Sequence, residues 1–116
     1  MKIGVPKEIK NNEFRVSLTP YSVQSLTNNS HDVFVQSGAG ASIGFDDNQY
    51  IEAGAKVLDS AEEVYKSATL IVKVKEPMPS EFIHLNENHT LFTYLHLAGD
   101  PSQAAELIAT GVTGIA

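Results

Sequence analysis

Three residues of this sequence have side chains suited to binding and converting a small organic acid. Lys75 and His96 each stand just beyond a short apolar run, at residues 69–74 and 90–95. Arg15 lies in a polar segment that follows the first predicted strand. A guanidinium suits bidentate carboxylate binding, an ammonium can hold a carboxylate or polarise a carbonyl, and an imidazole exchanges protons near neutral pH. Together they indicate a site for a small carboxylate with an exchangeable oxygen or nitrogen.

Each of these residues also has an ordinary structural explanation. A loop cation such as Arg15 is usually solvated, and a histidine at a strand end often bonds to a neighbouring loop. Lys73 alternates with Val72 and Val74, and we expect its side chain to lie on a solvated strand face. The remaining histidines lie in polar segments without metal-ligand spacing, and we expect them to be solvated: His31, His84 and His89.

Short apolar runs alternate with helix signals along the sequence. Such alternation implies right-handed crossovers and an α/β fold with a doubly wound, mostly parallel sheet in a single domain. Ligands of open α/β sheets bind beyond the carboxyl ends of the strands, so Lys75 and His96 should stand at one edge. The predicted strands cover residues 2–5, 32–36, 56–58, 69–74, 90–95 and 112–116, and predicted helices start after Thr19, Asp46 or Asp47, Ser60 and Asp100.

The composition argues against several classes of partner and site. The formal net charge is −6, without a basic cluster, which argues against nucleic acid or an anionic membrane as partner. The chain has no cysteine, so disulfides and thiolate metal sites are excluded, and no metal site is expected. Because no apolar run is long enough to span a bilayer and the N-terminus has no signal-peptide pattern, the expected location is the cytoplasm.

The glycine-rich segment 38–44 follows a predicted strand and precedes a helix, as nucleotide-binding loops do. Its spacing, G-x-G-x-x-x-G, is one residue longer than the dinucleotide fingerprint. Asp46 and Asp47 follow at the place where a pyrophosphate would approach the helix, and their charge would repel it. A structural turn is the better explanation, and no cofactor-binding residue is expected in this chain.

Four stretches together closely resemble the N-terminal part of the bacterial alanine dehydrogenase family: KIGVPKEIKNNEFRVSLTP, GAGASIGF, IVKVKEP and LFTYLHLA. The resemblance runs along essentially all 116 residues. The wider family includes the proton-translocating nicotinamide nucleotide transhydrogenases. VKVKEP and TYLHLA favour alanine dehydrogenase, because transhydrogenases lack the histidine at the end of that strand.

The resemblance implies an enzyme that interconverts L-alanine and NAD with pyruvate, ammonium and NADH. The family's substrate-binding arginine and lysine fall on Arg15 and Lys75, and its catalytic histidine falls on His96. Family members are commonly hexamers, so a homo-oligomer is expected. Residues 1–116 would form an incomplete N-terminal substrate domain, because relatives carry the NAD-binding domain further along the chain. The 116-residue chain alone is therefore expected to be inactive.

Two other functions remain open from the sequence. The first is the soluble subunit of a transhydrogenase, or a lysine-pathway relative that uses the same fold. The second is a non-catalytic ligand-binding or interaction module descended from the family. The joint presence of Arg15, Lys75 and His96 argues against such a module, because a protein released from catalysis does not need all three.

Overall fold

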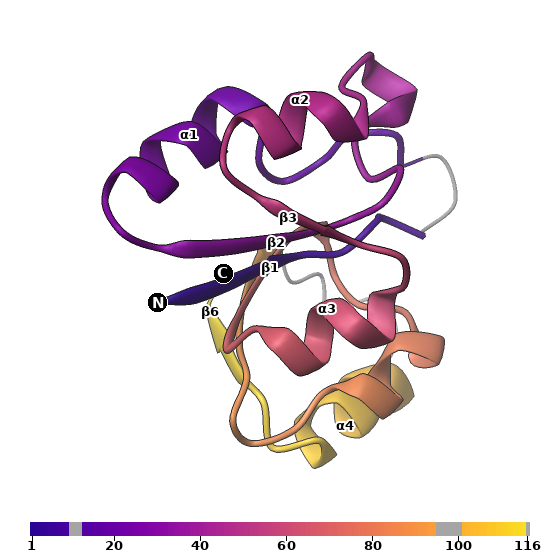
Figure 1. Cartoon of the computed structure of the whole chain (residues 1–116). Coiled ribbons are helices and arrows are strands. Elements are labelled where there is room, and N and C mark those ends of the chain that lie inside the picture. The colour runs from indigo at the N-terminus through magenta and orange to yellow at the C-terminus, as the bar shows by residue number, and fades with distance from the viewer. Residues whose placement is uncertain (10–12, 95–100, 116) are drawn as a thin grey trace.

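A six-stranded sheet forms the centre of the chain in this computed structural model, which describes residues 1–9, 13–94 and 101–115 (Figure 1). All of its strand pairs are parallel, in the order β3-β2-β1-β4-β5-β6. The expected doubly wound α/β fold is therefore confirmed. The strands are β1 (Lys2–Val5), β2 (Asp32–Gln36), β3 (Lys56–Leu58), β4 (Leu70–Lys75), β5 (Thr90–Tyr94) and β6 (Thr113–Ile115).

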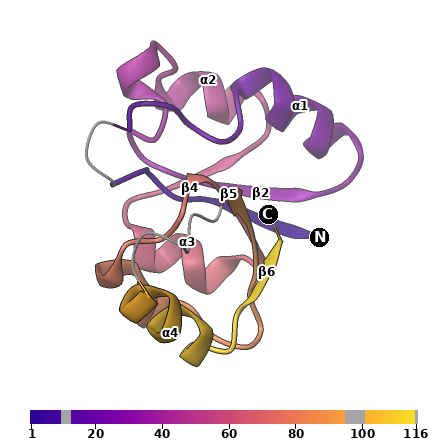
Figure 2. The same cartoon turned by 180° about the vertical axis from the view of Figure 1, so that it is seen from behind.

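The helices lie on both faces of the sheet. One face carries α1 (Pro20–Asn28) and α2 (Asp47–Glu52), and the other carries α3 (Ala61–Ser67) and α4 (Pro101–Ala109), as Figures 1 and 2 show. Two short 3-10 helices, η1 (Ala41–Ile43) and η2 (Pro79–His84), lie in the connections. The chain builds β1, β2 and β3 outward in one direction and then returns to place β4 on the other side of β1. The order of strands therefore reverses between β1 and β4.

The helices begin at the side chains that the sequence indicates. Thr19 accepts a hydrogen bond from the Ser22 N–H at the start of α1, where Pro20 occupies the first turn. Asp46, rather than Asp47, caps α2 and forms a capping box with Gln49. Ser60 caps α3 by accepting a hydrogen bond from the Glu63 N–H at 3.2 Å. Local sequence signals therefore coincide with these helix starts.

Each face of the sheet has its own apolar core. On the first face Val5, Val23 and Val35 pack with Tyr50, whose hydroxyl donates to the Leu18 carbonyl at 2.8 Å. On the second face Tyr65 and other buried side chains pack below α3 and α4: Phe34, Ala68, Ile71, Leu85, Leu91 and Leu107. Within the described residues, no helix is long and apolar enough to cross a membrane.

Gly4 lets α3 approach the sheet closely. A Cβ at this position would lie 2.8 Å from Ala68 Cβ and 2.9 Å from Val64 Cγ1. Contacts that short are repulsive, so any larger residue would push α3 away from β1. The absence of a side chain at Gly4 therefore allows α3 to pack closely on β1.

Candidate active site

The reversal of strand order places the ends of β1 and β4 side by side. In doubly wound folds a ligand binds in the crevice at such a point, because the connections leave in opposite directions. β1 ends at Val5 and leads into a polar segment that carries Glu8, Glu13 and Arg15, while β4 ends at Lys75. Two of the three predicted site residues therefore belong to this edge.

A bulge shapes the end of β4. Val72 pairs with Phe92 and Lys75 pairs with Tyr94, so three steps along β4 match two along β5. An extra residue of this kind re-aims the side chains that follow it, and bulges are frequent beside functional sites. The bulge therefore determines how Lys75 is presented.

The Glu8 carboxylate accepts hydrogen bonds from the end of β4, beyond the point where β1 pairs with β4. The last pair between these strands is Gly4 with Ile71. Further along β4, Glu8 Oε2 accepts from the Val74 N–H at 3.0 Å and Glu8 Oε1 accepts from the Lys75 N–H at 3.1 Å. A side chain thus replaces the missing strand carbonyls and holds the backbone of Lys75 in place.

Lys73 is buried, and the expectation of a solvated strand face for it is wrong. Its ammonium lies 3.3 Å from Glu8 Oε1 and 3.2 Å from Glu81 Oε2, and its side chain is 1% exposed. Tyr65 donates its hydroxyl proton to Glu81 Oε2 at 2.8 Å, and Glu81 Oε1 accepts from the Met78 N–H. A buried ammonium is tolerated only with such partners. Lys73 is therefore a structural cation beneath the edge.

The pKa of Tyr65 is raised first by burial and then by this negative charge. Burial raises it far above its ordinary value, and the neighbouring Glu81 charge and hydrogen bond add to the increase. The phenol therefore stays protonated and acts as a donor to Glu81. With two carboxylates and one ammonium, the buried triad of Glu8, Lys73 and Glu81 carries a net negative charge directly below the site.

Glu13 binds the guanidinium of Arg15. Arg15 donates from Nε and from its backbone N–H to Glu13 Oε2, and from Nη2 to Glu13 Oε1, each at 2.9 Å. The side chain of Glu13 is 4% exposed, whereas that of Arg15 is 64% exposed. The hydrogen bonds from Arg15 lower the pKa of Glu13 from 4.5 to about 2, so this carboxylate is ionised throughout the neutral range.

Lys75 belongs to the same group of charges. Its positive charge also contributes to the lowered pKa of Glu13, and the Glu8 charge contributes to the raised pKa of Arg15. Arg15 and Lys75 are 60 positions apart in the sequence, yet Arg15 bonds to Glu13 and Lys75 lies within electrostatic range of the same carboxylate. His96 lies outside the described residues, and Tyr94 is the last described residue of β5, the neighbour of β4. Glu13 itself was missed by the sequence analysis; its position two residues before Arg15 was the available signal.

The glycine-rich segment 38–44 forms a turn that an internal acid fills. Asp47 Oδ1 accepts from the Gly38 N–H at 2.9 Å, and Asp47 Oδ2 accepts from Ser37 Oγ at 2.6 Å. These bonds lower the pKa of Asp47. Gly38 and Gly44 adopt positive φ angles, and a Cβ on Gly40 would meet Phe45 at 2.8 Å. The segment is a structural turn, in which the Asp47 carboxylate already occupies the Gly38 N–H that could otherwise donate to a phosphate.

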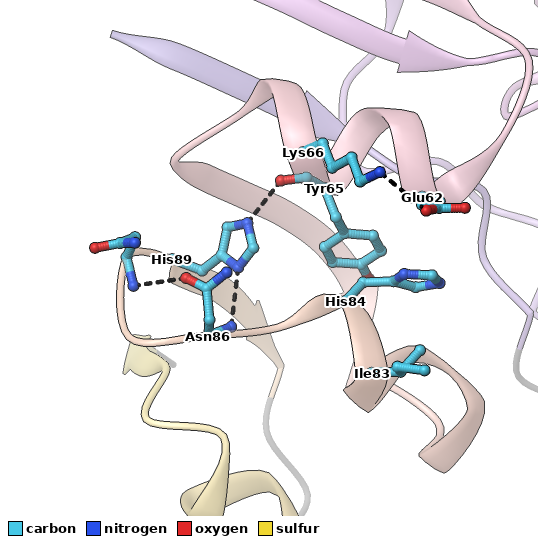
Figure 3. A pocket seen from close by; sticks show the side chains of 8 residues that line it. Glu62, Tyr65, Lys66, Ile83, His84, Asn86 and His89 are labelled. Carbon is cyan, nitrogen blue, oxygen red and sulfur yellow. Dashed lines mark hydrogen bonds and ion pairs between the residues drawn. The ribbon is translucent and has the colours of Figure 1, made fainter.

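A cavity of about 500 Å³ lies away from this edge, between α3 and the connection from η2 to β5 (Figure 3). His89 forms part of its wall and is 4% exposed, so the expectation that it is solvated is wrong. Its Nδ1 accepts from the Asn86 N–H at 3.1 Å and its Nε2 lies 2.7 Å from the Tyr65 carbonyl oxygen. With Nδ1 as acceptor, Nε2 carries the proton and donates. Both ring nitrogens are used, and the role of His89 is structural.

Comparison with known proteins gives a consistent family. Residues 4–116 match the model of the alanine dehydrogenase/PNT N-terminal domain. The whole chain aligns with alanine dehydrogenase of Methanococcus maripaludis at 48% identity and of Bacillus subtilis at 49% identity, and it covers 31% and 30% of these proteins. The chain therefore spans about a third of the length of the curated relatives it matches.

Solved structures agree with the sequence comparison. An L-alanine dehydrogenase structure superposes on the whole chain with a TM-score of 0.95 at 48% identity, and the chain covers 32% of it. A transhydrogenase from Sinorhizobium meliloti superposes with a TM-score of 0.91 at 28% identity, and the chain covers 34% of it. Both have this fold, and the higher identity is to the alanine dehydrogenase.

Proposed function

Since the chain belongs to the alanine dehydrogenase/PNT family and corresponds to its N-terminal domain, we propose that it is the substrate domain of an NAD-dependent alanine dehydrogenase. The reaction is the reversible oxidative deamination of L-alanine to pyruvate and ammonium. The observation that carries the proposal is that the Glu13-bound Arg15 follows β1 and Lys75 ends β4, the two strands between which the strand order reverses. Two cations at a ligand-binding edge suit a small substrate that contains a carboxylate.

In this proposal each residue has one task. Arg15 holds the substrate carboxylate through the N–H groups that Glu13 leaves unused. Lys75 contacts the carboxylate or polarises the carbonyl oxygen, and its backbone is held by Glu8. His96 moves protons at the substrate oxygen and nitrogen as ketone and amine interconvert. Residues 1–116 form the incomplete substrate domain.

The glycine-rich segment 38–44 is poorly suited to a dinucleotide. The one glycine-rich turn is closed by Asp47, whose carboxylate would repel a pyrophosphate. We therefore assign NAD, which supplies the hydride chemistry, to a domain outside this chain. A cytoplasmic homo-oligomer, a hexamer in the full-length form, completes the proposal.

The test is NADH consumption by the longest polypeptide that carries this chain. With pyruvate and ammonium present, absorbance at the NADH band should fall, and the signal should vanish when ammonium is left out. Activity that persists without ammonium, or no activity despite a nucleotide-binding domain, would contradict the proposal. The 116-residue chain alone should give no turnover, and measurable oxidation of L-alanine by it would contradict that part.

A transhydrogenase component is the second candidate, because a transhydrogenase structure superposes with a TM-score of 0.91. The discriminating assay is hydride exchange between NADH and an NADP analogue. Exchange without alanine oxidation would favour this candidate.

A further inference from the structure

Glu13 binds one side of the Arg15 guanidinium, and within the described residues no other acceptor bonds to the opposite side. A guanidinium has five N–H donors, arranged as two forks. Nε and Nη2 donate to the two oxygens of Glu13, which leaves the two Nη1 hydrogens and one Nη2 hydrogen for an incoming carboxylate. In the described part of the chain, Glu13 is the acid that contacts this side chain. The buried carboxylate thus fixes the plane in which Arg15 can meet a substrate.

Glu13 also reduces the positive charge of the site. Arg15 and Lys75 bring two positive charges, and Glu13 offsets one of them. The buried triad below, Glu8, Lys73 and Glu81, is itself negative and adds no positive charge. Among the described residues named here, one positive charge therefore remains for a ligand to neutralise.

We propose that Glu13 is a specificity-determining residue that restricts this site to 2-oxo acids with a single carboxylate. This inference rests on the proposed function. The first carboxylate of a substrate neutralises the one remaining positive charge of the site. A second carboxylate would then find no cation to pair with, and Glu13 would repel it. Removing the Glu13 charge releases one positive charge, which a dicarboxylate can then use.

The experiment compares pyruvate with oxaloacetate, a dicarboxylic 2-oxo acid of similar size. It uses the longest polypeptide that carries this chain, with Glu13→Gln to remove the charge and Glu13→Asp to keep it. The exposed Glu52 on α2 supplies the matched control, Glu52→Gln. The readout is the ratio of kcat/KM for oxaloacetate to kcat/KM for pyruvate, because a general loss of folding would lower both values and leave their ratio unchanged.

In Glu13→Gln the ratio of kcat/KM values should rise by about tenfold or more, which is the effect that one charge contact commonly has on binding. The pyruvate KM should rise at the same time, because Arg15 loses its support. Glu13→Asp and Glu52→Gln should keep the wild-type ratio. A ratio in Glu13→Gln that stays at the wild-type value, or moves toward pyruvate, would overturn the inference.

The two proposals can fail separately. A wild-type protein that aminates pyruvate, together with an unchanged ratio in Glu13→Gln, refutes only the role of Glu13. A wild-type protein without this activity refutes the proposed function, and the role of Glu13 is then judged from calorimetric affinities for pyruvate and oxaloacetate. The same shift in their ratio of Kd values would support the role, and failure of both anions to bind would overturn it.

Discussion

The ammonium of Lys73 lies 3.3 Å from Glu8 Oε1, with both side chains almost fully buried. This pair joins the start of the polar segment to the middle of β4, across 65 sequence positions. It also explains how a lysine can lie buried on this face of the sheet. The same Glu8 carboxylate also holds the backbone N–H of the half-buried Lys75.

Removing the Lys73 charge should destabilise the fold strongly. Lys73→Met leaves Glu8 and Glu81 buried without a cation, and breaking a buried pair in this way costs roughly 3–5 kcal/mol. Lys66→Met is the control, because Lys66 and Glu62 form an exposed pair worth about 0–1 kcal/mol. Urea unfolding of both variants measures the difference. Equal midpoints for the two would show that the buried pair is not needed.

The Glu13–Arg15 pair should make stability depend on pH in the acid range. The folded pKa of Glu13 is about 2, below the ordinary 4.5, so its contribution is complete above about pH 4.5 and is lost as the pH falls toward 2. Glu13→Gln should therefore melt at a lower Tm than wild type at pH 6, and the gap should narrow below pH 4.5. Because Arg15 is exposed, the gap should also shrink in high salt. A gap that widens on acidification contradicts the assignment.

Gly4→Ala should lower stability, because the added methyl group overlaps Ala68 and Val64 of the α3 region. Overpacking of this kind costs about 1–3 kcal/mol. Ala68→Gly, combined with Gly4→Ala, removes the atom at 2.8 Å and should recover part of the loss, apart from the intrinsic cost of the new glycine. Thermal unfolding of the single and double variants measures both effects. No recovery in the double variant would mean that Ala68 is not the obstacle.

His96→Ala in the longest polypeptide should reduce turnover of L-alanine by about 10²–10⁴-fold, because that is the usual loss when a general acid–base group is removed. His31→Ala serves as the control, since His31 lies before β2 and contacts the N-terminal ammonium at the opposite edge of the sheet. Steady-state kcat is the measurement. Turnover within about tenfold of wild type for His96→Ala would refute its catalytic role.

Local patterns were sufficient for most of the fold. Strands β1, β2 and β3 occupy the predicted residues, and three helices start at the predicted caps. The buried charges were not predictable in the same way. Lys73 reads locally as a solvated lysine, and its partners become visible only when Glu8 and Glu81 are brought to it by the fold. His89 is a similar case, since its partner is a backbone carbonyl 24 positions away.

The position of Arg15 and Lys75 at one edge of the sheet was predictable from the sequence, but their surroundings there were not. Parallel strands place their carboxyl ends at one edge, which is enough to associate Arg15 with Lys75. The shared carboxylate of Glu13 and the bulge in β4 depend on side-chain packing and strand register, which no short sequence pattern specifies.

The polar segment that carries Arg15 is bonded to β4 on both sides of that residue. Upstream, Glu8 receives the N–H groups of Val74 and Lys75, and downstream Ser17 Oγ donates to the Val72 carbonyl at 2.7 Å. The distance between Arg15 and Lys75 is therefore set by contacts to one strand, β4, and does not depend on the twist between neighbouring strands. If a second domain moves relative to this one, Arg15 and Lys75 should therefore move together as one rigid unit. A bound acid would then be released when the second domain moves away from the site, while the distance between Arg15 and Lys75 stays the same.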